Sequence, residues 1–169
     1  MTDTLRILGV AGSLRAGSYN RALLRAAVRL APEGMEIEVF DLLEVPLYNG
    51  DVEAAGDPPG VMGFKQAISA ADGVLMVTPE YNHGVPGVMK NAVDWASRPP
   101  REAPLEGKPV GLIGASTGIT GTARGQSQLR QAFEFFPQPR LGPAGLDEDA
   151  AVLGRDDEQR IARHRGAIS

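Results

Sequence analysis

Residues Gly12 to Asn20, GSLRAGSYN, combine the side chains and the backbone that bind phosphate groups in proteins. The segment follows a strand-like apolar run and leads into a helix-like pattern, and the N–H groups and dipole at the start of a helix attract anions. The donors and the cation are Ser13, Arg15, Ser18 and Asn20. The alternative is structural, because Gly, Ser and Asn also form turns and helix N-caps.

The same segment departs from two common nucleotide-binding patterns. It nearly fits GxxxxGK[ST], but Ser18 stands at the lysine position and Tyr19 follows it. Because that lysine neutralises the β and γ phosphates and the next hydroxyl holds magnesium, nucleoside triphosphate chemistry is disfavoured. GxGxxG is also missing, which weakens the case for a classical dinucleotide fold.

A second segment, PEYNHGVPGVMKNAVDW from Pro79 to Trp95, has the residue types to border a flat ring. Pro79 stiffens the exit from a strand, Tyr81 supplies an aromatic face, and Asn82 supplies a donor and an acceptor. Taken alone, Tyr81 is better explained as a half-buried packing residue. Together with the first segment it suggests a mononucleotide cofactor.

Other residues of this segment have simpler explanations. Glu80 can pair with a backbone amide, because a carboxylate beside a reducible ring would oppose added negative charge. His83 is expected to be exposed or locally hydrogen-bonded rather than catalytic. Pro86 suits the first turn of a helix, whose buried face is predicted to consist of Val88, Met89, Ala92 and Val93.

A third glycine-rich loop, GASTGITGTARG at 114–125, has small residues that let a ring approach the backbone. The alternative is a flexible connection before a helix at 126–136. Its position beside the other two loops favours the ligand-binding interpretation.

The elements that carry these loops alternate between apolar runs and helical patterns, as in βαβ units with a parallel sheet. The predicted strands start at Leu5, Met35, Val74 and Val110, and the second has the polar alternation of an edge strand. We predict a doubly wound α/β fold with the flavodoxin-like order 2-1-3-4-5. Loops 11–20, 78–86 and 115–123 then meet at the carboxyl ends of the strands, beside the switch point.

The amphipathic first helix is predicted to bury Leu23, Leu24, Ala27 and Val28. A fifth strand at 138–141 contains a proline, which suits an edge strand or a strand start. The segment YNGDVEAAGDPPG at 48–60 is predicted to be a surface loop. The whole chain, 1–169, is expected to form one domain.

Composition excludes several classes of function. The net charge of −4 gives no basic field for nucleic acid or an anionic membrane. With no cysteine and only two histidines, the chain offers no disulfide and a metal site is improbable. The N-terminus lacks the pattern of a signal peptide and no run is long enough to span a membrane, so the cytoplasm is the expected location.

Together, the three segments and the approach AADGVLMVTPEYN resemble the NADPH-dependent FMN reductase family, which includes quinone, chromate and azo-dye reductases. The resemblance covers roughly residues 5–146. It implies a flavodoxin-like three-layer sandwich with a five-stranded sheet, noncovalent FMN, and a homodimer or homotetramer with flavins at subunit interfaces. The C-terminal DDEQRIARHRGAIS leaves a shorter last helix than is usual in the family.

The resemblance also assigns residues to the cofactor. Those expected to hold the FMN phosphate are Ser13, Arg15, Ser18, Tyr19 and Asn20. Those expected to border the ribityl chain and the isoalloxazine are Pro79, Glu80, Tyr81 and Asn82. Those expected at the far ring edge are Ser116, Thr117 and Gly118.

In this reading FMN carries the chemistry, so no side-chain nucleophile or catalytic residue is needed. The hypothesis is a ping-pong reaction that passes hydride from NADPH or NADH through FMN to a small acceptor such as a quinone. An arginine near the mouth could select NADPH. The alternatives are a flavodoxin-type one-electron carrier and a noncatalytic FMN or phosphate-binding module.

Overall fold

The computed structural model describes residues 4–134 of the chain. Its elements in chain order are β1 (Leu5–Ala11), α1 (Tyr19–Arg29), β2 (Met35–Phe40), the short 3-10 helix η1 (Leu42–Glu44), α2 (Gly50–Ala55), α3 (Pro59–Ala70), β3 (Gly73–Val77), α4 (Gly87–Ala96), β4 (Val110–Ile113) and α5 (Ala123–Glu134).

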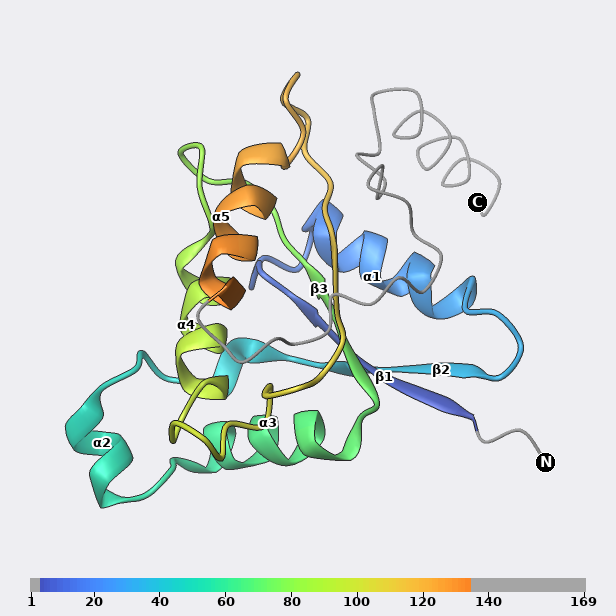
Figure 1. Cartoon of the computed structure of the whole chain (residues 1–169). Coiled ribbons are helices and arrows are strands. Elements are labelled where there is room, and N and C mark those ends of the chain that lie inside the picture. The colour runs from blue at the N-terminus through green and yellow to red at the C-terminus, as the bar shows by residue number, and fades with distance from the viewer. Residues whose placement is uncertain (1–3, 135–169) are drawn as a thin grey trace.

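Within these residues the strands form one parallel sheet in the order β2-β1-β3-β4 (Figure 1). β1 lies between its neighbours, with Gly9 opposite Val39 on one side and Leu75 on the other. The predicted order of the first four strands is confirmed. The predicted fifth strand, 138–141, lies outside the described residues.

Burial follows the positions of the strands in the sheet. Every residue of β3 except Leu75 is buried, as expected for a parallel strand covered on both faces. In β2 the exposed Glu36 and Glu38 alternate with half-buried Met35 and Ile37, which confirms an edge strand. Two hydrophobic clusters result, one on each face of the sheet.

The helices cover the two faces unequally. The larger cluster packs α3, α4 and α5 against the sheet, while the smaller one contains Leu23 and Leu24 of α1 (Figure 1). This arrangement is what right-handed crossovers produce for the observed strand order. Val28, predicted to be buried, is exposed, so the apolar stripe of α1 is narrower than its sequence pattern suggests.

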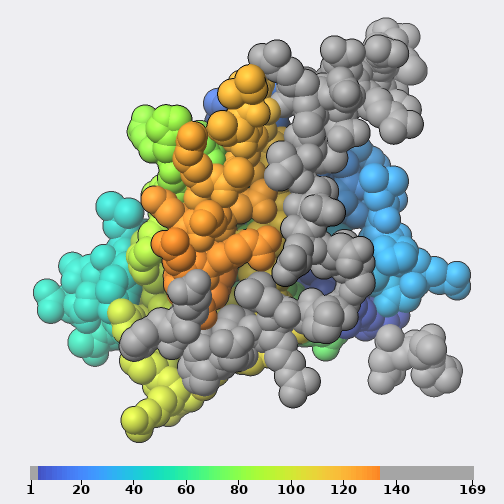
Figure 2. Space-filling model, turned by 45° about the horizontal axis from the view of Figure 1, so that its top comes forward, coloured from blue at the N-terminus to red at the C-terminus, as the bar shows by residue number. Residues whose placement is uncertain are grey.

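The excursion at 48–60, predicted to be a loop, contains the helix α2, so that prediction is wrong. Asn49 starts this helix, because its side chain accepts a hydrogen bond from the Asp51 N–H at 2.9 Å. The segment projects from the side of the molecule (Figures 1 and 2).

Two side chains of α4 anchor this excursion. Asn91 accepts from Tyr48 N at 2.7 Å and donates to Pro46 O at 2.8 Å. The Trp95 indole N–H donates to the same Pro46 carbonyl at 2.8 Å. These contacts explain why Asn91 is buried on α4.

Two helix boundaries also differ from prediction. Pro86 is the N-cap, with α4 starting at Gly87, and α5 starts at Ala123 rather than 126.

None of the helices within residues 4–134 is long and apolar enough to cross a membrane.

Candidate functional site

The loops that follow β1, β3 and β4 meet at the carboxyl ends of the strands, as predicted. Gly12 N donates to Val77 O at 2.9 Å, which joins the first loop to the end of β3. The Ser13 hydroxyl lies 3.2 Å from the Tyr81 hydroxyl, within hydrogen-bond distance. These contacts place the candidate phosphate loop directly beside the candidate ring loop.

The first loop has the donors that an anion requires. Ser18 is the N-cap of α1, and its hydroxyl oxygen accepts from Asn20 N at 3.2 Å and Arg21 N at 3.5 Å. The hydroxyl proton is still available for a ligand. Within residues 4–134, the structure shows no hydrogen-bond acceptor for the backbone N–H groups of Ser13 to Gly17. Unpaired donors at a helix start fit a phosphate.

Asn20 has a position that the sequence did not reveal. Its buried side chain donates to Ala115 O and accepts from Ala115 N, both at 2.9 Å. This paired contact joins the start of α1 to the third loop across the sheet. Asn20 therefore positions two loops of the site relative to each other.

Gly12 and Gly114 allow close backbone packing beneath the site. A Cβ at Gly12 would lie 3.2 Å from Pro79 Cδ, and one at Gly114 would lie 2.3 Å from Thr78 O. Gly114 permits β4 to pass next to the end of β3. The glycine-rich sequence around position 114 does not reveal that only glycine fits there.

The ring loop is a tight reverse turn. Tyr81 and Gly84 exchange backbone hydrogen bonds of 3.1 and 3.0 Å around Asn82 and His83. Both central residues have positive φ, 51° and 63°, as in the type I′ turn that normally prefers Asn and Gly. Pro79 is buried below the turn, whereas the Tyr81 residue is 51% exposed and accessible to a ligand.

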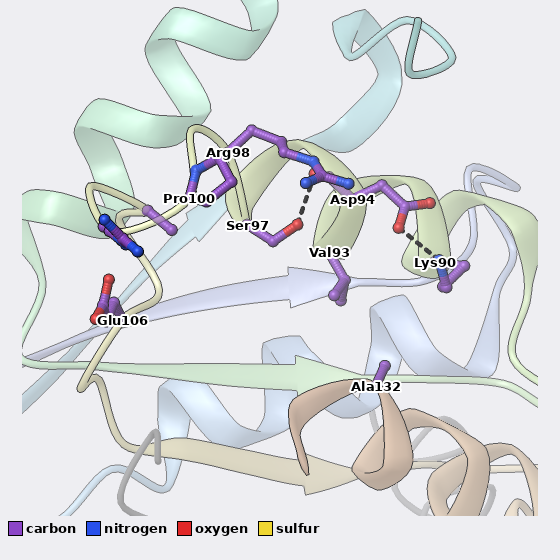
Figure 3. A pocket seen from close by; sticks show the side chains of 10 residues that line it. Lys90, Val93, Asp94, Ser97, Arg98, Pro100, Glu106 and Ala132 are labelled. Atoms are coloured by element: carbon purple, nitrogen blue, oxygen red, sulfur yellow. Dashed lines mark hydrogen bonds and ion pairs between the residues drawn. The ribbon is translucent and has the colours of Figure 1, made fainter. Parts of the chain in front are cut away.

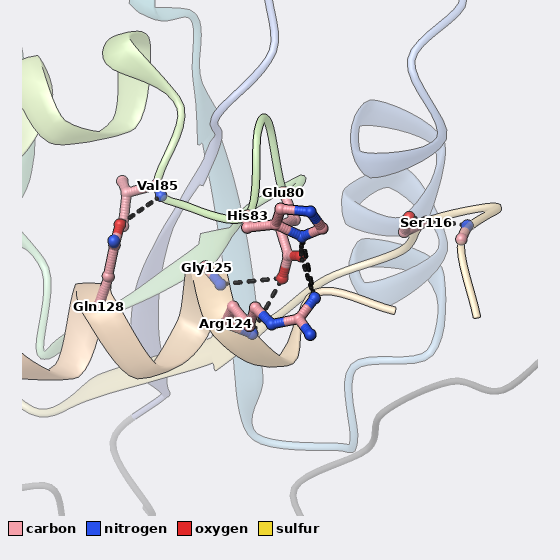
Figure 4. A network of polar contacts seen from close by, with 8 residues as sticks. Glu80, His83, Val85, Ser116, Arg124, Gly125 and Gln128 are labelled. Atoms are coloured by element: carbon pink, nitrogen blue, oxygen red, sulfur yellow. Dashed lines mark hydrogen bonds and ion pairs between the residues drawn. The ribbon is translucent and has the colours of Figure 1, made fainter. Parts of the chain in front are cut away.

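Glu80 forms the expected contact with backbone amides. Its carboxylate accepts from Arg124 N at 2.9 Å and from Gly125 N at 3.0 Å (Figure 4). The side chain is only 6% exposed. Glu80 therefore satisfies N–H groups at the start of α5, a task that usually falls to a residue next to the helix.

A second side chain connects the ring loop to α5. Gln128 Oε1 accepts from Val85 N at 2.9 Å, and the same oxygen would lie 2.6 Å from a Cβ at Gly84. Figure 4 shows that this contact lies to one side of Glu80 and its amide partners. The start of α5 and the ring loop are thus held together at two points.

His83 is exposed, as predicted, and its hydrogen-bond partner is the distant Arg124. Its Nδ1 lies 2.9 Å from Arg124 Nη1 and 3.6 Å from Glu80 Oε1. Near the start of the third loop, apart from this group, the Ser116 hydroxyl accepts from Gly118 N at 3.0 Å (Figure 4). Thr117 and Gly118 are exposed.

A separate groove of about 490 Å³ lies between α4, the segment 97–106 and Ala132 of α5 (Figure 3). Its lining includes Arg98, whose buried Nε has no hydrogen-bond partner within residues 4–134 and whose guanidinium lies over the Tyr48 ring at 5.5 Å. None of the predicted site residues lines this groove.

Residues 4–134 contain no group of three or more His, Cys, Asp or Glu side chains that could hold a metal ion. The donors around the first loop suit a phosphate, and the exposed tyrosine and tight turn suit a planar ring beside it. The fold and the site are those of a parallel α/β protein whose crevice, at the switch point of the sheet, suits a mononucleotide.

Comparison with known proteins gives the family. The model for "NADPH-dependent FMN reductase" matches residues 5–143. The chain is therefore a member of the NADPH-dependent FMN reductase family, whose members are oxidoreductases that use FMN and NAD(P)H.

Two curated relatives and one solved structure agree. An NAD(P)H-dependent FMN reductase of Pseudomonas aeruginosa is 55% identical over 95% of this chain and 90% of its own length. A quinone reductase of Escherichia coli is 44% identical over 80% of this chain and 73% of its own. The flavoenzyme NAD(P)H:(acceptor) oxidoreductase of Paracoccus denitrificans has a TM-score of 0.73 and 30% identity, over 96% of this chain and 94% of that one.

Proposed function

We propose that the protein is an FMN-dependent NAD(P)H:quinone oxidoreductase that also reduces other small acceptors, such as chromate or azo compounds. The observation that carries the proposal is the row of unpaired N–H groups from Ser13 to Gly17, within residues 4–134, next to the exposed Tyr81. The N–H groups suit a phosphate and the exposed tyrosine suits a ring, so one site can hold both parts of FMN. The names of the Pseudomonas and Escherichia relatives support NAD(P)H as donor and a quinone as acceptor.

Bound FMN supplies hydride acceptance and electron transfer, and the protein binds and orients the reactants. On the phosphate side we propose direct contacts from Ser13, Arg15, Ser18 and Tyr19. On the ring side we propose contacts from Pro79, Tyr81, Asn82, Ser116, Thr117 and Gly118.

Two of the predicted contact residues have a different proposed role. Asn20 uses its amide to join α1 to the third loop, and Glu80 uses its carboxylate to join the ring loop to α5. We propose that both position the loops that contact FMN.

A homodimer or homotetramer is proposed as the working assembly. The exposed Leu43 of η1 and Leu47, just before the excursion at 48–60, fit a face that a second copy covers. Light scattering gives the mass in solution, and a monomer at micromolar concentration would reject this assembly.

The lack of cysteine agrees with a proposed cytoplasmic location.

Anaerobic reduction of the purified holoprotein tests the function. Addition of NADPH or NADH without any partner protein should bleach the flavin absorption, and a quinone should restore it. A yellow protein that stays oxidised would instead support a one-electron carrier. A colourless protein that also fails to bind added FMN would remove the basis of the proposal.

A further inference from the structure

A pair of hydroxyl groups connects the ring loop to the phosphate loop. The Tyr81 hydroxyl lies 3.2 Å from Ser13 Oγ, although the two residues are 68 positions apart in the chain. Within residues 4–134, each hydroxyl is the only hydrogen-bond partner of the other. Ser13 is buried, with 3% of its surface exposed, whereas Tyr81 is 51% exposed. Tyr81 thus extends its hydroxyl from the open part of the crevice to a buried side chain of the phosphate loop.

The fold does not require this pair to hold the two loops together. Gly12 N already joins the phosphate loop to Val77 O at the end of β3. The ring loop is fixed by its own reverse turn and by the contacts of Glu80 and Gln128 with the polypeptide backbone. Since all these contacts remain when the Tyr81 hydroxyl is removed, a role in ligand binding explains the pair better than a role in folding.

The two hydroxyls can act in series on an anion. Each carries one proton, and its oxygen can accept hydrogen bonds. When Tyr81 donates to Ser13 Oγ, the Ser13 proton is free to donate elsewhere, beside the N–H of the same residue, which has no acceptor within residues 4–134. A hydroxyl that donates to an anion becomes a better acceptor, so a phosphate at Ser13 would also strengthen the hydrogen bond from Tyr81.

We propose that Tyr81 recognises the FMN phosphate through Ser13, by donating to Ser13 Oγ while the Ser13 hydroxyl donates to a phosphate oxygen. This inference rests on the proposed function. Tyr81 is a positioning residue for the Ser13 hydroxyl, and its aromatic face remains available to the ring side of the cofactor. A residue of the ring loop therefore contributes to the selection of FMN over riboflavin, which lacks the phosphate.

Flavin binding to the full chain, freed of its cofactor, tests this series of contacts. We would measure the dissociation constants of FMN and riboflavin from the quenching of flavin fluorescence, for wild type and Tyr81→Phe. The variant keeps the aromatic face and should keep the melting temperature of wild type. FMN binding should weaken about fivefold, the scale of one hydrogen bond, with less than about a twofold effect on riboflavin.

Tyr48→Phe is the matched control. The Tyr48 hydroxyl donates to Glu53 Oε2 at 2.7 Å, and Tyr48 belongs to none of the three loops of the site. The control also loses one tyrosine hydroxyl and its hydrogen bond, but it should bind both flavins as wild type does.

A double-mutant cycle shows whether Tyr81 acts through Ser13. Ser13→Ala removes the hydroxyl that contacts Tyr81 and is proposed to contact the phosphate, and it should weaken FMN binding about tenfold. Addition of Tyr81→Phe to Ser13→Ala should weaken FMN binding by less than about a further twofold, because the group on which Tyr81 acts is missing.

Three results would overturn the inference. They are an unchanged FMN affinity in Tyr81→Phe, an equal loss of FMN and riboflavin affinity, and an undiminished effect of Tyr81→Phe in the Ser13→Ala background. The proposed function fails on a different result. A wild-type flavin that neither NADPH nor NADH bleaches would reject the function, whereas the affinities for FMN and riboflavin would still decide the role of Tyr81.

Discussion

The phosphate side and the ring side of the crevice are held by different kinds of contact. The phosphate loop is held by a local cap, since Ser18 caps α1, and by a backbone hydrogen bond from Gly12 to the end of β3. The ring loop is instead held by Glu80 and Gln128, through contacts that span more than forty residues. The ring side should therefore lose its geometry more readily, while the phosphate side should lose only ligand affinity.

The largest expected effect is that of Gly114→Ala, on the ring side. A Cβ there would lie 2.3 Å from both Thr78 O and Thr122 Oγ1, so the backbone of β3 or the third loop must move. We expect a loss of about 3 kcal/mol or more in the free energy of unfolding, because overpacking against backbone cannot relax easily. Urea unfolding of the apoprotein measures the loss.

Gly118→Ala is the matched control for that experiment. Its nearest contact would be Ser116 Oγ at 3.4 Å, and its φ is not in the left-handed region. The control should retain wild-type stability within about 0.5 kcal/mol. Equal stabilities of the two variants would contradict the close approach of β3 and β4 at Gly114.

A smaller loss is expected from Glu80→Ala. Removal of the carboxylate leaves the N–H groups of Arg124 and Gly125 without their acceptor, at a cost of about 2 kcal/mol in the free energy of unfolding. Glu80→Gln keeps one acceptor oxygen and should lose about half as much. Hydrogen exchange at the start of α5 should quicken in Glu80→Ala, and unaltered exchange there would show that the cap is not needed.

Sequence patterns were sufficient for the features that depend on neighbouring residues. The strand order, the edge position of β2 and the convergence of three loops all follow from periodicity and the rules of parallel sheets. The N-cap at Ser18 was open to prediction because it lies directly before a helical pattern. The short helix α2 was missed, although Asn49 and the acidic Asp51 and Glu53 are ordinary signals of a helix start.

Contacts between distant residues could not be read from the sequence. Nothing near Asn20 in the chain indicates that its amide pairs with Ala115, which is 95 residues away. Glu80 was expected to meet a backbone amide, but its partners at the start of α5 were not identifiable. Such contacts depend on how the sheet brings loops together, and a propensity scale does not contain that information.

On the phosphate side, Arg15→Gln should affect FMN rather than the fold. Arg15 is exposed, so the melting temperature of the apoprotein should not change. FMN affinity should fall about tenfold, because a charge-assisted contact to phosphate is lost. Riboflavin, which lacks the phosphate, is the control ligand and should bind wild type and variant alike. An equal loss of riboflavin affinity would mean that Arg15 does not contact the phosphate.

The smallest effect is expected at the ion pair that connects α1 to the start of η1. Arg21 Nη2 lies 2.7 Å from Asp41 Oδ2, with both side chains partly exposed. Asp41→Asn removes the charge but keeps an oxygen that can accept from Leu43 N, so the start of η1 is preserved. The expected loss at neutral pH is about 0.5 kcal/mol, as is usual for a solvent-exposed pair.

The pH dependence gives this pair a specific signature. The hydrogen bond from Arg21 lowers the pKa of Asp41 below its ordinary value of 3.8. Since the folded pKa is the lower one, the stabilisation is complete above the unfolded value and disappears as the pH falls through the folded value. Wild type and Asp41→Asn should differ by a constant amount from about pH 5 to 8 and converge below the folded pKa, with a smaller difference in high salt. A difference that persists in strong acid would mean that Asp41 stabilises the fold by some contact other than its charge.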